Sequence, residues 1–190
     1  KLAASLDGHT ALDNGVSQWI TGEAARRDGH AWRKRASAVL TGVGTVPVWG
    51  EQVLLCRRAI EPRHGLWTLP AGFMEMGETT AEGALRETIE EAGAHIELQG
   101  LFTLLNVVRV GQLHLYYRAR LLDTEFDPGP ETIEAQLFHE HEIPWDHLAF
   151  RTVRETLQRY FEDRRRGQFG LHAGQQLRGA LFKAAVEGRE

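Results

Sequence analysis

The alternation of apolar and polar residues predicts several β-strands in this chain. Residues 112–122 alternate most regularly, and residues 95–108 form a second long strand. Shorter apolar runs at 37–46 and 53–58 have the character of buried strands, and residues 135–138 add another short one. These segments together predict a β-sheet.

Helices are predicted where apolar residues recur at helical spacing or where capping residues bracket a segment. Residues 151–166 carry apolar side chains at i, i+4, i+7 and i+8, which would give one face that packs on the sheet. These residues are Val153, Leu157, Tyr160 and Phe161. Thr79 or Thr80 can cap the start of another helix, and Gly93 suits the left-handed position after its end. A third helix is expected over residues 21–35.

The helix that ends near Gly93 is unusually rich in carboxylates. Residues 72–94 contain six glutamates and one arginine. Glu87, Glu90 and Glu91 are three and four residues apart, so their side chains project from one face of the helix. Like charges at this spacing repel each other, and Mg²⁺ is a cation that takes such oxygen ligands. The alternative is an acidic face in contact with solvent.

The spacing in this segment resembles the Nudix box, in which two glycines, four glutamates and an arginine stand at fixed distances. The matching residues are Gly72, Glu78, Arg86, Glu87, Glu90, Glu91 and Gly93. Thr88 and Ala94 occupy two positions that are apolar in the family pattern, a difference that we expect to affect packing rather than chemistry. The resemblance implies the α/β Nudix fold, an α/β/α sandwich around a mixed β-sheet.

The resemblance also implies how the box would bind a metal ion. Glu87 and Glu91 are the expected ligands, and Glu90 is either a third ligand or the residue that orients the attacking water. The backbone carbonyl of Gly72 is a further expected ligand. The cofactor would be Mg²⁺ or Mn²⁺, which polarises a bridging phosphate and lowers the pKa of a bound water.

Other residues are candidates for positioning and for substrate binding. Arg86 is expected to hold Glu78 in a charge-assisted pair, which positions the loop between them. Arg58 is either a surface charge at a strand edge or a ligand for the substrate's phosphates. Trp67 either anchors the loop before the box by packing or stacks on a substrate base.

Two further carboxylates follow a predicted turn at residues 127–130. Glu131 and Glu134 lie where many Nudix enzymes place an additional carboxylate near the metals, and Glu134 is a candidate ligand on that ground. The alternative for both is a carboxylate on a surface loop.

Residues 46–174 resemble Nudix hydrolases of the FAD and ADP-ribose pyrophosphatase type. The stretches that carry this resemblance are 53–58, 64–73, 128–131, 142–145 and 148–150. The implied reaction is metal-dependent hydrolysis of the pyrophosphate bond of a nucleoside diphosphate linked to another moiety, which releases a nucleoside monophosphate. A catalytically inactive nucleotide-binding module is the alternative.

Residues 1–46 resemble a different family, the reductase domain of the bifunctional riboflavin-biosynthesis deaminase/reductase. The matching stretches are 1–8, 19–22 and 42–46, so the chain has the character of a chimera. A nicotinamide-dependent reductase is a further alternative, but a fragment this short lacks the strand ends that build a dinucleotide pocket.

Three parts of the chain are therefore expected. They are an N-terminal appendage at 1–37, a Nudix domain at 38–174 and a C-terminal tail at 175–190. The tail is expected to dock on the domain, to pair with a second copy in a homodimer, or to fray.

Composition narrows the classes of partner. The chain has 190 residues, is 42% hydrophobic and 25% charged, and carries a net charge of −4, which gives no basic surface for nucleic acid or anionic membranes. Cys56 is the single cysteine, which rules out an internal disulfide and a cysteine-built zinc site. Without an apolar run of spanning length or a signal peptide, we expect a cytoplasmic protein that acts on a small nucleotide.

Overall fold

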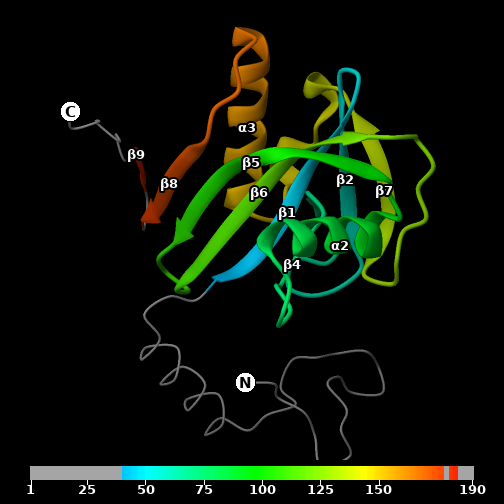
Figure 1. Cartoon of the computed structure of the whole chain (residues 1–190), viewed down its shortest axis with the longest axis horizontal. Helices are drawn as coiled ribbons and strands as arrows, with labels where there is room; N and C mark the ends of the chain where they lie inside the picture. The colour runs from blue at the N-terminus through cyan, green and yellow to red at the C-terminus, as the bar shows by residue number, and fades with distance from the viewer. Residues whose placement is uncertain (1–39, 178–179, 184–190) are drawn as a thin grey trace, which may run out of the picture. The chain divides into compact units, whose positions relative to one another are not determined.

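The computed structural model describes residues 40–177 and 180–183 (Figure 1). The helix predicted over residues 21–35 and the last residues of the tail lie outside these ranges. In the part of the chain that the structure describes, no helix is long and apolar enough to cross a membrane.

A nine-stranded mixed sheet forms the centre of the described chain. Its main path runs β3-β2-β1-β6-β5-β8-β9, while β4 pairs with β1 and β7 pairs with β2. The pairs β1–β6 and β5–β8 are parallel, and the others are antiparallel. The strands are β1 (Leu40–Trp49), β2 (Gln52–Arg58), β3 (Trp67–Thr68), β4 (Ala71–Gly72), β5 (Ile96–Val107), β6 (Gln112–Leu121), β7 (Thr132–Phe138), β8 (His172–Leu177) and β9 (Ala180–Lys183).

Strand β1 lies in the middle of the sheet and has three partners. Along nearly its whole length it pairs in parallel with β6. On its other side, Val43 and Gly44 pair with β4, whereas Val48 and Trp49 pair with β2. A tight turn follows β1, with Gly50 at a φ of +57°. This strand therefore connects the part of the sheet that carries β4 to the long β5–β6 pair.

Two α-helices cover opposite faces of the sheet (Figure 1). They are α2 (Thr80–Ala92) and α3 (Arg151–Arg166), and two 3₁₀ turns, η1 (Glu140–Glu142) and η2 (Trp145–His147), precede α3. Because side chains alternate along a strand, Leu55 points to the cluster that contains α3 residues and Leu54 points to the one that contains Ala92 of α2. The predicted α/β/α sandwich with a mixed sheet is confirmed.

The face covered by α3 contains the larger hydrophobic cluster. The face predicted for this helix is confirmed, since Val153, Leu157, Tyr160 and Phe161 are all buried. Phe102 from β5 packs edge-on to Tyr160, with ring centroids 6.3 Å apart. The predicted bounds of α3 also agree with the structure.

The C-terminal tail contributes to the sheet in the described residues. The residues of β8 pair in parallel with β5, and β9 pairs with β8 as an antiparallel neighbour. The division that the sequence predicted at residue 174 therefore falls within β8. Strand β7 is longer than predicted, because it begins at Thr132 rather than at residue 135.

Candidate active site

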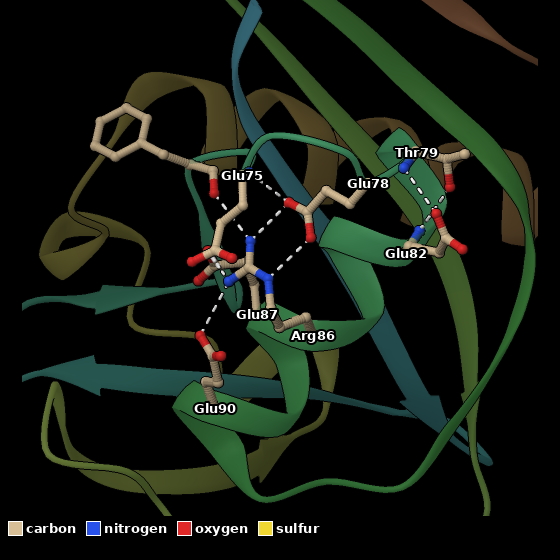
Figure 2. Close-up of polar contacts among 8 residues, drawn as sticks. Glu75, Glu78, Thr79, Glu82, Arg86, Glu87 and Glu90 are labelled. Atoms are coloured by element: carbon tan, nitrogen blue, oxygen red, sulfur yellow. Dashed lines mark hydrogen bonds and ion pairs between the residues drawn. The ribbon is translucent and has the colours of Figure 1, made fainter. Parts of the chain in front are cut away.

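Local hydrogen bonds fix both ends of the acidic helix α2. At its start, the Thr79 hydroxyl accepts from the Glu82 backbone N–H at 3.2 Å, and the Glu82 carboxylate accepts from the Thr79 N–H at 2.8 Å (Figure 2). At its end, Gly93 has a φ of +60°, and its N–H donates to the Ile89 carbonyl at 2.8 Å. The predicted caps are both present, and they set the positions of the glutamates between them.

Arg86 is the centre of a polar network on this helix (Figure 2). Its guanidinium donates to both carboxylate oxygens of Glu78, at 3.0 and 2.8 Å, so the predicted pair is present. It also donates to Glu87 at 2.7 Å, to Glu90 at 3.0 Å and to the Phe73 carbonyl at 3.0 Å. One arginine therefore hydrogen-bonds to three of the box glutamates and fastens the loop before the helix.

The pair between Arg86 and Glu78 keeps both groups charged. The hydrogen bond from Arg86, followed by the one from the Glu75 backbone N–H, lowers the pKa of Glu78 to about 2. The same contact with Glu78 raises the pKa of Arg86 above its already high usual value. Glu78 is thus held as a structural carboxylate and does not exchange protons near neutral pH.

Glu91 and Glu87 lie in a less polar environment on the side of α2 that faces the sheet. Glu91 is buried and accepts the Ala71 N–H at 2.9 Å. Its pKa is raised to about 8, mainly by burial and also by the charge of Glu87, while the Ala71 N–H and Arg58 oppose the rise. Burial also raises the pKa of Glu87, against the opposing effect of Arg86. Glu91 therefore has no salt-bridge partner among the described residues, and Glu87 shares Arg86 with Glu78 and Glu90.

Gly72 leaves room for these carboxylates. It pairs with Val43 in the sheet, and a Cβ built on it would collide with the carboxylate of Glu87. Strand β4 thus places the Gly72 backbone against Glu87 and the Ala71 N–H against Glu91. This close approach requires glycine at position 72.

Of the two carboxylates after the 127–130 turn, Glu131 is the one whose charge acts on Glu87 and Glu91. Its charge raises the pKa of both Glu87 and Glu91. Glu134 lies on β7 and forms a salt bridge with Arg57 at 3.0 Å, with both side chains nearly half exposed. The sequence pointed to both residues and favoured Glu134 as a ligand. The salt bridge of Glu134 could not be foreseen from it, because that contact depends on which strands pair.

The segment before Glu131 packs tightly on the end of α2. A Cβ on Gly129 would collide with the Glu90 carbonyl, and a Cβ on Gly93 would collide with the backbone of Asp127. These glycines let the 127–130 turn lie directly against the helix. The contact brings Glu131 toward the acidic face from a distant part of the sequence.

Arg58 and Trp67 both lie inside the fold. Arg58 is only 9% exposed, so its interpretation as a strand-edge surface charge is wrong; its Nε–H donates to the Pro62 carbonyl at 2.9 Å. The guanidinium carbon also lies 5.2 Å from the centroid of the Phe150 ring. The Trp67 ring packs edge-on to Phe138, with ring centroids 4.9 Å apart. Of the two roles considered for Trp67, this contact corresponds to packing.

The donor set fits a divalent cation that takes part of its coordination from other sources. Within residues 40–177 and 180–183, no group of three or more His, Cys, Asp or Glu side chains is arranged to hold a metal, and Arg86 engages Glu87 and Glu90. The buried Glu91 and the partly buried Glu87, both with raised pKa values and beside a glycine backbone, nevertheless suit Mg²⁺, which commonly uses one or two carboxylates together with water and substrate phosphate.

Comparison with known proteins gives two family matches. A sequence model of the NUDIX domain matches residues 39–160, and a model of the RibD C-terminal domain matches residues 1–63. The predicted combination of a Nudix domain with a reductase-like segment is therefore confirmed. The two matched ranges overlap over residues 39–63, which include β1 and β2.

Individual relatives match only parts of the chain. Riboflavin biosynthesis protein RibD of Bacillus amyloliquefaciens is 56% identical over 46 residues, which cover 24% of this chain and 12% of that protein. The human 8-oxo-dGDP phosphatase NUDT18 is 36% identical over 100 residues, covering 50% of this chain and 30% of that protein. The chain thus spans well under half the length of either relative.

Solved structures resemble a larger part of the chain. A NUDIX hydrolase from Nitrosomonas europaea has a TM-score of 0.68 and 47% identity, covering 72% of this chain and 78% of its own. An ADP-ribose pyrophosphatase from Streptococcus suis has a TM-score of 0.58 and 25% identity, covering 70% of this chain and 97% of its own.

Proposed function

Because this chain belongs to the NUDIX hydrolase family, we propose that it hydrolyses the pyrophosphate bond of a nucleoside diphosphate linked to a second moiety. Substrates of the FAD and ADP-ribose kind are expected, with release of a nucleoside monophosphate. The observation that carries this proposal is the position of Glu87 and Glu91 against β4. Glu91 is buried and has no salt bridge among the described residues, and the partly buried Glu87 lies beside Gly72.

Glu87, Glu91 and the carbonyl of Gly72 would hold the cofactor, Mg²⁺ or Mn²⁺. When bound, the cation polarises a phosphate oxygen and lowers the pKa of a water ligand. The Glu90 side chain is 58% exposed, and among the described residues it bonds only to Arg86, so it can reach solvent and orient the attacking water. Arg86 keeps Glu78 and the Phe73 carbonyl in place, which fixes the loop that follows Gly72.

Arg58 is suited to bind a substrate phosphate next to this pair. Within the described residues its Nε–H has a hydrogen-bond acceptor, while its two terminal nitrogens have none. A guanidinium that is nine-tenths buried gains strongly from a bidentate anion, and its charge already acts on Glu91. Trp67 supports the loop by packing on Phe138.

Glu131 is the additional carboxylate that we expect to act with the box. It is coupled electrostatically to Glu87 and Glu91, whereas Glu134 is occupied by Arg57. Matched variants separate the two assignments. Glu131→Gln should lower turnover by about tenfold or more, and Glu134→Gln should change it less than about twofold. The opposite ranking would return the role to Glu134.

The proposed reaction is tested by product analysis with Mg²⁺ or Mn²⁺ over FAD, ADP-ribose, NADH and diadenosine polyphosphates. AMP should appear from at least one of these compounds and should disappear when a chelator is added. A folded protein that binds one of them but releases no product would instead be a nucleotide-binding module, the alternative favoured by the engagement of Glu87 and Glu90 with Arg86. A titration with NADPH should be flat, because the reductase-like segment lacks the strands of a cofactor pocket.

A further inference from the structure

Two buried hydroxyls join strand β1 to helix α2. Thr45 and Thr88 are both 0% exposed, and their Oγ1 atoms lie 2.7 Å apart. The Thr88 hydroxyl also donates to the Ala84 carbonyl at 2.7 Å. Because a hydroxyl has one proton, Thr45 must be the donor and Thr88 the acceptor between the two threonines.

This contact closes a ring of contacts that includes the buried carboxylate of Glu91. The Thr45 N–H donates to the Pro70 carbonyl at 3.1 Å, and the next residue, Ala71, donates its N–H to Glu91 at 2.9 Å. Glu91 lies three residues after Thr88 on the same helix, and Thr88 in turn accepts from Thr45. The ring thus links β1, β4 and α2 through polar atoms that are shielded from water.

The backbones around this ring are packed so closely that small movements of the helix are transmitted. A Cβ on Gly44 would collide with Ala71 of β4. On the helix, a Cβ on Gly83 would lie 3.0 Å from the Val43 side chain of β1. With so little space between the elements, a single directional contact can set the rotation and height of α2 on the sheet.

We infer that the Thr45–Thr88 hydrogen bond is a positioning contact, which holds Glu87 and Glu91 of α2 against strand β4. Thr45 lies in the overlap of the two matched ranges, and Thr88 stands at a position that is apolar in the Nudix pattern. The inference rests on the proposed function only for the cation that the carboxylates would bind.

A second buried threonine pair provides a matched control. Thr103 of β5 and Thr156 of α3 are also fully buried, and their Oγ1 atoms lie 3.0 Å apart on the opposite face of the sheet. Thr88→Val and Thr156→Val therefore remove the same chemistry from two sites. Valine suits position 88, since the Nudix pattern places an apolar residue there, so the variant should fold.

The first measurement is amide exchange at Ala71 in chelator-treated protein, relative to a β5 amide that reports global opening. Thr88→Val should raise this ratio by about tenfold, because the Ala71–Glu91 contact loosens, whereas Thr156→Val should change it less than about twofold. Thr88→Ser keeps the hydroxyl and should restore the ratio. The double variant Thr45→Val/Thr88→Val should recover stability, because no hydroxyl is left unpaired, but not Ala71 protection.

The second measurement is Mn²⁺ binding by calorimetry. Thr88→Val should bind about tenfold more weakly than wild type, with Thr88→Ser and Thr156→Val unchanged. An unchanged Ala71 ratio in folded Thr88→Val, or equal effects of the two valine variants, would overturn the inference. A wild-type protein that binds no Mn²⁺ would contradict the cation of the proposed function, and the Ala71 ratio would still decide the role of the threonines.

Discussion

The two faces of the sheet use buried groups differently. Beneath α3, large side chains such as Phe102, Leu157 and Phe161 fill one continuous cluster. Beneath α2, the helix contributes small residues such as Ala84 and Ala92 to two smaller clusters. Burial of large apolar surface supplies most of the stability of a fold, so the α3 face is the part that holds the domain together.

Each helix also buries one glutamate, and the two glutamates differ in their partners. Glu155 of α3 forms an i,i+4 salt bridge with Arg159 at 3.0 Å. Glu91 of α2 accepts a backbone N–H and has no salt bridge among the described residues. The first carboxylate is satisfied within the protein, and the second would gain from an external cation. The comparison indicates that α3 mainly stabilises the fold, whereas α2 carries a buried carboxylate that stabilises the fold less and is suited to a candidate site.

The largest expected effect is that of Glu91→Gln. Its amide can still accept the Ala71 N–H, but it cannot carry the charge that binds a cation, so turnover should fall by at least about a thousandfold, or about 4 kcal/mol. The measurement is AMP release at saturating substrate, with thermal unfolding to confirm the fold. Glu155→Gln is the control and should keep turnover. Equal turnover in wild type and Glu91→Gln would show that Glu91 is not part of the active site.

Truncation of a leucine on each face comes next. Leu157→Ala on α3 should lower the free energy of unfolding by about 3 kcal/mol, because Leu157 is fully buried, and Leu85→Ala on α2 should cost less than about 2 kcal/mol, because Leu85 is only partly buried. Urea titrations measure both values. Equal losses, or a larger loss at Leu85, would contradict the assignment of stability to the α3 face.

A further effect on stability is expected from pH in the absence of metal. The pKa of Glu91 is about 8 in the folded protein and about 4.5 in the unfolded chain, so folding retains a proton that the unfolded chain has lost. This contribution to stability is complete below pH 4.5 and is lost as pH rises to 8. Glu78, whose pKa is lowered to about 2, acts in the opposite sense and only below pH 4.5.

Denaturant titrations of chelator-treated protein between pH 5 and 8 measure this slope. The decline in unfolding free energy should be strongly reduced in Glu91→Gln, with a remainder from Glu87, whose pKa burial also raises, and it should be retained in Glu155→Gln. Added Mn²⁺ should flatten the decline, because a bound cation favours the carboxylate form. A slope that is unchanged in Glu91→Gln would assign the titration to another group.

The smallest expected change in stability is that of Gly72→Ala. The new methyl group would displace the flexible end of the Glu87 side chain. The free energy of unfolding should therefore fall by less than about 1 kcal/mol relative to wild type. Turnover should nevertheless fall by about tenfold, because Glu87 can no longer lie against β4. Gly170→Ala, which meets nothing within 4 Å, is the control in the same assays. A large loss of stability at Gly72 would show that this face also carries the fold.

The sequence predicted those parts of the site that depend on local rules. Thr79 and Gly93 mark the ends of α2 because capping involves residues a few positions apart. The pair between Arg86 and Glu78 followed from a resemblance whose spacing is fixed. The Nudix fold and the opposite placement of the two helices also followed from that resemblance and from the periodicity of α3.

The contacts that could not be predicted join segments that are distant in the sequence. Nothing local places Glu131 nearer to the box than Glu134, because that depends on how Gly129 packs on α2. Thr88 was expected to affect packing alone, and its hydroxyl instead meets Thr45 from a strand more than forty residues earlier. The pairing of β8 with β5 is likewise a matter of tertiary structure.

The central position of β1 has an evolutionary consequence. The range that matches the RibD C-terminal domain ends at residue 63, so it includes β1 and β2 as well as the residues before them. Excision of that whole range would remove the strand that pairs with β4 and β6. Because the NUDIX model also matches β1 and β2, any truncation that keeps the hydrolase fold, in evolution or in the laboratory, must cut before Leu40.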